Sequence, residues 1–143
     1  MPPTIEAVGA VTDEVMSSLA RLLPQLSSAD PPSRPILAEM VGSPEVTLLI
    51  ARDDSGAIVG TLTLAVIRQL TGVRAWIEDV VVDGPARGGG VATALIADAV
   101  RRATEAGART VDLTSRPERE AANRLYTNLG FERRDTHVYR YTP

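Results

Sequence analysis

The chain has 143 residues, of which 44% are apolar and 23% charged, and its formal net charge at pH 7 is −3. This length fits one domain, residues 1–143, with one core, and the composition is that of a globular protein rather than a disordered or membrane protein. The acidic balance argues against a general nucleic-acid binder, because such proteins carry a basic surplus. The chain has no cysteine and a single histidine, His137, so a thiolate or histidine-rich metal site is not expected and we predict no metal.

The N-terminal stretch MPPTIEAVGA lacks a basic segment followed by an apolar core, and no apolar run of the chain is long enough to span a bilayer. We therefore expect no membrane partner and a cytoplasmic location.

A short strand and two helices are predicted in the first third of the chain. The first helix, 12–23, has Thr12 or Asp13 as its N-cap and apolar residues at helical spacing. A segment rich in Pro and Ser, 26–35, connects it to a shorter helix, 34–42, which ends at a glycine.

Three antiparallel strands are predicted next. The stretch 46–52 is followed by the tight turn DDSG and by the strand 57–67, which is the pattern of a β-hairpin. A second turn at 71–72 leads into the strand 74–83.

The remainder of the chain alternates between helices and strands. A helix over 91–107, a strand over 109–115, a helix over 119–130 and a last strand over 136–141 follow in order. This order predicts an α/β (α+β) fold: one mixed, mostly antiparallel sheet with a central βαβ unit and flanking helices.

Three consecutive glycines, Gly88 to Gly90, stand between the third strand and the helix at 91–107. A strand, a glycine-rich turn and a helix N-terminus together bind phosphate or pyrophosphate, because the first helical N–H groups lack partners and the helix dipole is positive there. Arg87 would add a charge-assisted contact.

Two other glycine motifs do not match this turn. A P-loop needs Lys and then Ser or Thr after the glycines, which this turn lacks. A dinucleotide-binding fingerprint needs Gly or Ala where this chain has Thr93. The alternative is that the glycines only permit a tight connection.

Two motifs resemble a known family. Residues Arg87-Gly88-Gly89-Gly90-Val91-Ala92 are similar to the signature of the GNAT superfamily of acetyl-CoA-dependent N-acetyltransferases, and LYTNLGF, 125–131, looks like its LY-x-x-x-GF segment. The predicted order of elements also resembles that family over the whole chain. The resemblance implies transfer of an acetyl group from acetyl-CoA to a primary amine of a small molecule, by direct attack.

The resemblance also implies how acetyl-CoA is held. Backbone amides of the glycine turn would bind its pyrophosphate, and its pantetheine arm would lie along the preceding strand like an added strand. The implied cofactor-binding residues are Val80, Val81, Val82, Arg87, Gly88, Gly89, Gly90, Val91, Ala92, Arg119 and Asn123. Arg119 stands where many members have asparagine, which leaves its role open.

Two catalytic residues are expected. Tyr126 occupies the position of the tyrosine that protonates the departing thiolate in many members; its other interpretation is a core aromatic, and the two are compatible. Glu78 or Asp79 would accept the proton of the amine. By strand alternation the two carboxylates point to opposite faces unless a bulge intervenes, and Glu78 is favoured because it would share an apolar face with Trp76 and Val80. A plain surface charge is the alternative for Glu78.

The triplet Ile77-Glu78-Asp79 also resembles glucosamine-6-phosphate N-acetyltransferases, which suggests a small amine acceptor. The expected substrate residues are Trp76, Asp79, Ser115 and Arg116. Ser115 and Arg116 have a simpler interpretation as the charged entry to the last helix. A protein or peptide acetyltransferase acting on lysine or an N-terminus, and a non-catalytic acyl-CoA sensor, remain alternatives. A homodimer, formed through the last strands or the sheet edge as in many relatives, also stays open.

Overall fold

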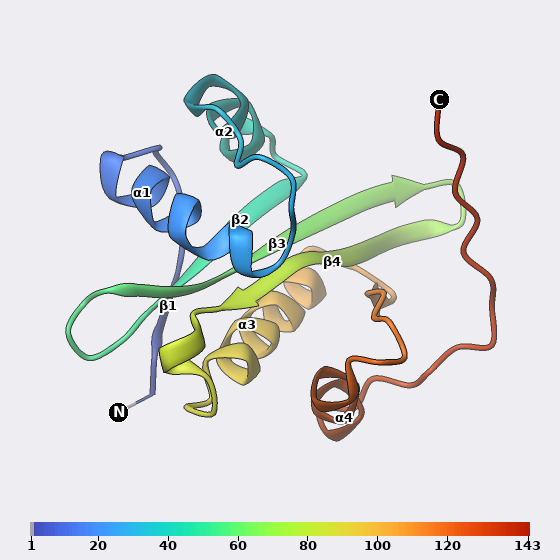
Figure 1. The fold of residues 1–143 in the computed structure, drawn as a ribbon. Helices are drawn as coiled ribbons and strands as arrows, with labels where there is room; N and C mark the ends of the chain where they lie inside the picture. The colour runs from blue at the N-terminus through green and yellow to red at the C-terminus, as the bar shows by residue number, and fades with distance from the viewer. Residues whose placement is uncertain (1) are drawn as a thin grey trace. The chain divides into compact units, whose positions relative to one another are not determined.

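The computed structural model describes residues 2–143 and contains one five-stranded sheet with strand order β1-β2-β3-β4-β5 (Figure 1). The first four strands are antiparallel neighbours, and β5 pairs parallel to β4. The chain divides after Leu113 into a first unit that holds the whole sheet and a second unit, Thr114–Pro143, which we describe by itself. The strands are β1 (Thr4–Ala7), β2 (Val46–Arg52), β3 (Ile58–Gln69), β4 (Gly72–Val82) and β5 (Val111–Asp112).

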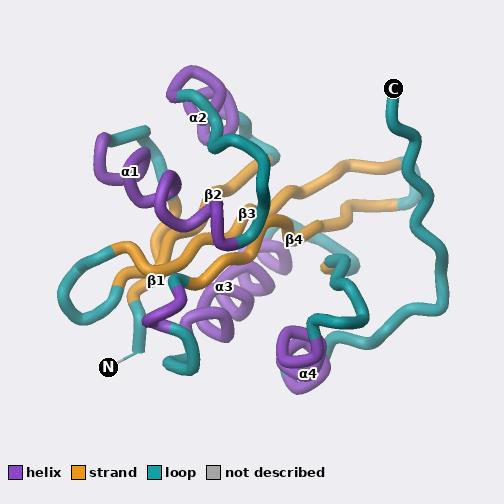
Figure 2. Tube along the Cα trace, viewed as in Figure 1, coloured by secondary structure: helices purple, strands orange, loops and turns teal. Residues whose placement is uncertain are grey.

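Helices pack on both faces of this sheet (Figure 2). The helices of the first unit are α1 (Asp13–Leu22), the short 3₁₀ helix η1 (Leu23–Gln25), α2 (Arg34–Gly42), the 3₁₀ turn η2 (Gly84–Ala86) and α3 (Val91–Glu105). The predicted N-cap of α1 is confirmed, because Thr12 Oγ1 accepts a hydrogen bond from the Val15 N–H at 3.2 Å. Within the described residues, no helix combines the length and the apolar character that crossing a bilayer requires.

One layer of the core lies between the sheet and helices α1 and α2. Its fully buried centre includes Leu22 of α1 and Leu37 of α2, which pack with Leu48, Ile58 and Val81 from three neighbouring strands. Burial of such aliphatic side chains stabilises a fold by about 1.5–3 kcal/mol each, so this cluster fixes α1 on the strands that lead to the glycine turn.

The other layer lies between the sheet and α3. Leu62 and Leu64 of β3 and Leu95 and Ile96 of α3 are fully buried there. At Gly60 a side chain would have almost no room: an added Cβ would lie 2.8 Å from Val91 Cγ1 and 3.2 Å from Leu95 Cδ1. The absence of a side chain on β3 therefore lets the first turn of α3 approach the sheet closely.

The predicted hairpins and the predicted βαβ unit are confirmed. At the first turn, Asp53 Oδ1 accepts hydrogen bonds from the N–H groups of Ser55 and Ala57, at 2.9 and 3.0 Å. The central unit is β4, α3 and the parallel strand β5, as expected. However, β5 is only two residues long, much shorter than the strand predicted over 109–115.

The predicted last strand over 136–141 is wrong. The segment contains no regular secondary structure and forms no backbone hydrogen bond within the described residues. Val138, Tyr139 and Tyr141 are 75%, 91% and 89% exposed. Alternating sequence gives only a weak preference for a strand, and the strand forms only where a partner satisfies its backbone groups.

The close approach at Gly60 yields a first prediction. Gly60→Ala should lower the free energy of unfolding by about 1–3 kcal/mol, because the methyl group forces Val91 or Leu95 away from its position. Gly42→Ala is the matched control, since an added Cβ at this last residue of α2 meets nothing within 4 Å. Chemical denaturation of both variants measures the difference, and equal stabilities would contradict the tight contact.

Candidate functional site

The glycine turn joins the end of β4 to the first residue of α3. Gly88 and Gly90 have φ angles of +84° and +81°, and Gly90 is the N-cap of α3. An added Cβ on either glycine would meet nothing within 4 Å, so these positions need glycine for backbone conformation and not for internal space. The open space around both Cα atoms leaves the backbone accessible from outside.

The backbone donors of this turn are free. Within residues 2–143, no protein acceptor is bonded to the N–H of Gly88, Gly89, Gly90 or Val91. No side chain caps α3 either, and the 15 residues of this helix add the partial positive charge of its dipole. The turn therefore presents several unpaired donors to one anion, as phosphate binding requires.

Arg87 precedes the glycines and is exposed. Its Nε donates to the carbonyl of Val82 at 3.3 Å, and the terminal N–H groups of its guanidinium have no partner in the described part of the chain. These groups remain available for a charge-assisted contact to phosphate.

Along β4, one strand edge is largely unpaired. β5 pairs only with Ala75 and Trp76, whereas β3 pairs with β4 as far as Val82. In the unit that holds the sheet, no strand lies beside β4 between Ile77 and Val82 on the β5 side. An exposed strand edge is where an extended ligand adds backbone hydrogen bonds, and this edge leads directly into the glycine turn.

A β-bulge interrupts β4 beside this edge. Thr63 pairs with Glu78 and Thr61 with Val81, so two residues of β4, Asp79 and Val80, oppose one residue of β3. Asp79 has φ +51°, the only positive value among the non-glycine residues described. A bulge in this position re-aims side chains and leaves one residue out of the ladder.

The bulge changes the faces predicted for the carboxylates. Directly paired residues share a face, so Trp76 and Glu78 lie on one face, as predicted, but the next residue on that face is Val81 and not Val80. The extra residue shifts the alternation by one position. Glu78 and Asp79 are both exposed, so the apolar surroundings expected for Glu78 are not formed.

A family comparison agrees with this geometry. Residues 13–131 match the model of the Acetyltransferase (GNAT) family. The chain belongs to the GNAT acetyltransferase family. Membership indicates acetyltransferase activity and leaves the acceptor open. No curated protein matches the sequence.

Solved structures share the GNAT fold over nearly the whole chain. An acetyltransferase from Trypanosoma brucei is 27% identical with a TM-score of 0.80, over 98% of this chain and 99% of that chain. An aminoglycoside acetyltransferase from an uncultured soil metagenomic sample is 23% identical with a TM-score of 0.82, over 99% and 97% of the two chains. Glucosamine-6-phosphate N-acetyltransferase from Arabidopsis thaliana is 17% identical with a TM-score of 0.81, over 98% and 99%. The predicted α/β fold and the predicted family are thus confirmed.

The second unit of this GNAT chain carries Tyr126 on helix α4 (Glu120–Asn128). The Tyr126 ring is half-buried and meets Phe131 edge to face, with ring centroids 6.0 Å apart. Burial raises the pKa of the Tyr126 phenol, and the nearby charge of Arg119 opposes this with a smaller effect. The phenol is therefore protonated throughout the neutral range.

The other expected residues of this unit lie around the start of α4. Arg119 is the N-cap of α4 and makes no side-chain capping bond. The Asn123 side-chain amide donates to the carbonyl of Arg116 at 3.0 Å, so it closes the turn before the helix. Ser115 Oγ is buried without a hydrogen-bond partner among the described residues, which marks it as a polar atom that needs a partner. Contacts of these residues with cofactor or substrate stay predictions.

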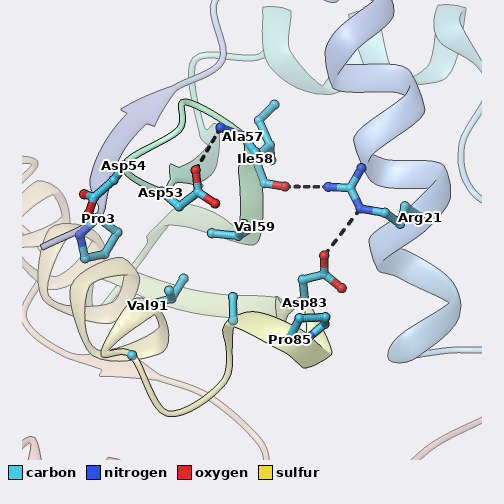
Figure 3. A pocket seen from close by; sticks show the side chains of 12 residues that line it. Pro3, Arg21, Asp53, Asp54, Ala57, Ile58, Val59, Asp83, Pro85 and Val91 are labelled. Carbon is cyan, nitrogen blue, oxygen red and sulfur yellow. Dashed lines mark hydrogen bonds and ion pairs between the residues drawn. The ribbon is translucent and has the colours of Figure 1, made fainter. Parts of the chain in front are cut away.

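A cavity of about 500 Å³ lies in the first unit beside the glycine turn (Figure 3). Gly89 and Val91 line it from the turn, and Arg21 and Asp83 line another part of its wall. The Arg21 guanidinium donates to the Ile58 carbonyl and lies 3.5 Å from an Asp83 oxygen. Sequence patterns gave no signal for Arg21, because its partners are distant in the chain and no motif links them.

No cluster of metal ligands is found in the part of the chain that the structure describes, which covers residues 2–143.

A charge placed in the glycine turn tests the phosphate site. Gly90→Asp should weaken coenzyme A binding at least about tenfold relative to Gly90→Asn, measured by calorimetry. Asn and Asp have nearly the same shape and both tolerate positive φ, so both variants carry the same backbone strain and differ in the negative charge. Equal affinities of the two folded variants would show that no phosphate is bound at Gly90.

The raised pKa of Tyr126 can be measured directly. An ultraviolet difference titration of the wild type against Tyr126→Phe isolates one of three tyrosines. We expect this phenol to ionise above the ordinary tyrosine value of about 10, because burial disfavours the phenolate. Ionisation at or below that value would contradict the burial of this phenol.

Proposed function

We propose that this chain transfers an acetyl group from acetyl-CoA to a primary amine of a small molecule by direct attack. One observation carries the proposal: the unpaired edge of β4 runs into a glycine turn whose N–H groups are free. An extended ligand with a pyrophosphate at one end fits both parts of this surface. Membership of the GNAT acetyltransferase family supports the same conclusion.

The residues of the turn fit the phosphate end of acetyl-CoA. When bound, acetyl-CoA supplies an activated thioester carbonyl. N–H groups of Gly88 to Ala92 and the guanidinium of Arg87 would hold the pyrophosphate, and backbone groups of Val80 to Val82 would pair with the pantetheine arm. We keep Arg119 and Asn123 as further proposed cofactor contacts.

Glu78 and Asp79 act on the acceptor side in this proposal. Both carboxylates are exposed at the bulge, where they attract a protonated amine, and Glu78 accepts the proton that the amine must lose before attack. The bulge frees backbone N–H groups of β4 to stabilise the charge that develops on the carbonyl oxygen. We propose Trp76, Ser115 and Arg116 as further acceptor contacts.

Tyr126 completes the proton balance. The new N–C bond forms as the C–S bond breaks, and Tyr126 donates its phenolic proton to the departing thiolate. The phenol carries its proton at neutral pH, as this role requires. The chain has no cysteine that could form an acyl-enzyme, which agrees with direct attack.

Kinetics of single variants test these roles. With an acceptor found by screening primary amines, Glu78→Gln should lower kcat/KM by about 10²–10⁴-fold and Tyr126→Phe should lower kcat, while coenzyme A binding stays unchanged. Asp79→Asn is the matched control for Glu78→Gln, since both carboxylates are exposed neighbours on the bulge. A larger loss in Asp79→Asn than in Glu78→Gln would reverse the assignment of the base.

Other outcomes distinguish the alternatives. Coenzyme A binding without turnover on any amine would favour an acyl-CoA sensor, and turnover on peptides but not on small amines would favour a protein acetyltransferase. All 15 basic residues are arginine and the chain contains no lysine, so acetyl-lysine found in a peptide assay cannot come from the enzyme itself.

A further inference from the structure

The junction where β4 ends determines how the glycine turn leaves the sheet. The Asp83 N–H donates to the carbonyl of Val59 at 2.8 Å, which closes the ladder between β3 and β4. The Ala86 N–H then donates to the Asp83 carbonyl at 2.9 Å, which folds residues 83–86 into the 3₁₀ turn η2. The orientation of Asp83 and Gly84 therefore sets the direction in which the chain continues to the three glycines.

Gln25, at the end of η1, forms hydrogen bonds to this junction through both the N–H and the oxygen of its side-chain amide. Its Nε2 donates to Asp83 Oδ1 at 2.9 Å, and its Oε1 accepts from the Gly84 N–H at 3.0 Å. Only a group that donates and accepts at once can make both bonds, and glutamine is long enough to do so from a neighbouring helix. These two bonds join Gln25 to Asp83 and Gly84, which lie 58 and 59 positions later in the sequence.

Arg21, which lies on α1 one helical turn before Gln25, also contacts this junction. Its guanidinium bonds to the carbonyl of Ile58 at the start of β3 and approaches Asp83, so it ties α1 to both strands of the hairpin (Figure 3). The Asp83 side chain is only 20% exposed, which strengthens its ion pair and its hydrogen bond relative to a fully exposed pair.

The rest of the turn has few other constraints. On the entrance side, Arg87 is held by its Nε bond to Val82 and by its N–H, which donates to the Gly84 carbonyl at 3.2 Å. On the helix side, the Ala94 N–H donates to the Gly90 carbonyl at 3.0 Å. A segment of three glycines has much conformational freedom to lose when it binds a ligand. Holding its entrance in one orientation reduces that loss and so strengthens binding.

We propose that Gln25 is a positioning residue for cofactor binding: its side-chain amide, together with the ion pair of Arg21, holds Asp83 and Gly84 so that the glycine turn is arranged for phosphate. This rests on the proposed function for its ligand, acetyl-CoA. The arrangement makes the helices before residue 26 part of the cofactor site, although no residue of α1 or η1 contributes a donor to the turn itself.

Gln25→Met tests the proposal, because methionine has a similar length and can make neither bond. We expect coenzyme A binding, measured by calorimetry, to weaken about three- to tenfold, the loss expected for one or two such hydrogen bonds. In the ligand-free protein, hydrogen exchange of the Ala86 and Arg87 amides should accelerate, because these two N–H groups bond to the carbonyls of Asp83 and Gly84, at 2.9 and 3.2 Å. With a known acceptor, KM for acetyl-CoA should rise while kcat changes less than about twofold.

Arg34→Ala is the matched control. Arg34 also ties the helical layer together, through Asp13 Oδ1 at 2.6 Å and the carbonyl of Val11 at 2.9 Å, and it makes no bond to the glycine turn. It should leave coenzyme A affinity and the exchange of the Ala86 and Arg87 amides unchanged. An equal effect of Arg34→Ala and Gln25→Met would overturn the proposal, because general loosening of the helices would explain both.

A reversal of donor and acceptor provides a rescue. Gln25→Glu keeps the acceptor for Gly84 but sets two carboxylates against each other, so it should bind coenzyme A more weakly than the wild type. Adding Asp83→Asn restores the pair, since the asparagine amide donates to the glutamate and its oxygen still accepts from Arg21. Affinity should recover in the double variant, and failure to recover would count against the pairing.

The outcomes separate the two levels of inference. If the folded wild type binds no coenzyme A, the proposed function fails, and exchange of the Ala86 and Arg87 amides alone then decides whether Gln25 positions the turn. If the wild type binds and Gln25→Met changes neither affinity nor exchange, the positioning role is overturned while the proposed function stands.

Discussion

Strand β4 is paired with β3 from Gly72 to Val82, apart from the bulge, whereas within the first unit its other edge is bonded only in its first half, and the rest of the site follows from this asymmetry. Backbone N–H and C=O groups need partners, so a strand edge left open inside a folded protein is a place where a ligand can supply them. The bulge at Asp79 acts on the same strand, because the extra residue turns side chains and backbone out of the regular ladder. One strand thus offers an edge, two carboxylates and the entrance to the glycine turn.

The glycine turn has an accessible backbone because it lacks the groups that usually cover or bond a turn. It has no side chains to fill the space at Gly88 and Gly90 and no capping side chain on α3, and within residues 2–143 no protein acceptor is bonded to the N–H groups of Gly88 to Val91. Such a segment is costly to order, and the structure compensates at its two ends: Gly60 lets α3 pack closely on β3 after the turn, and Gln25 fixes the junction before it. Because both ends of the turn are fixed and its glycines carry no side chains, several backbone N–H groups can donate to one anion.

Short-range patterns predicted the part of the fold that local physics decides. The cap at Thr12, the DDSG turn and the glycine turn all depend on neighbours in sequence, and all are confirmed. The β4–α3–β5 unit, also confirmed, followed from the order of the elements. The bulge could not be located, since it depends on which β3 residue each β4 residue meets. The strand over 136–141 was wrong for the same reason: alternation describes a strand that has a partner and does not say whether one exists.

The hydrogen bonds of Gln25 to Asp83 and Gly84 show how a helix without any sequence motif can affect the proposed cofactor site. Binding and positioning are reciprocal: if α1 and η1 favour the arrangement of the turn that binds phosphate, then a ligand in the turn must favour that position of α1 and η1 by the same free energy. The helices are held on the sheet by Leu22 and Leu37, so any ligand or partner that shifts this layer acts on the turn through Asp83 and Gly84. A ligand or partner that contacts this layer can therefore influence cofactor binding through residues that do not touch the cofactor.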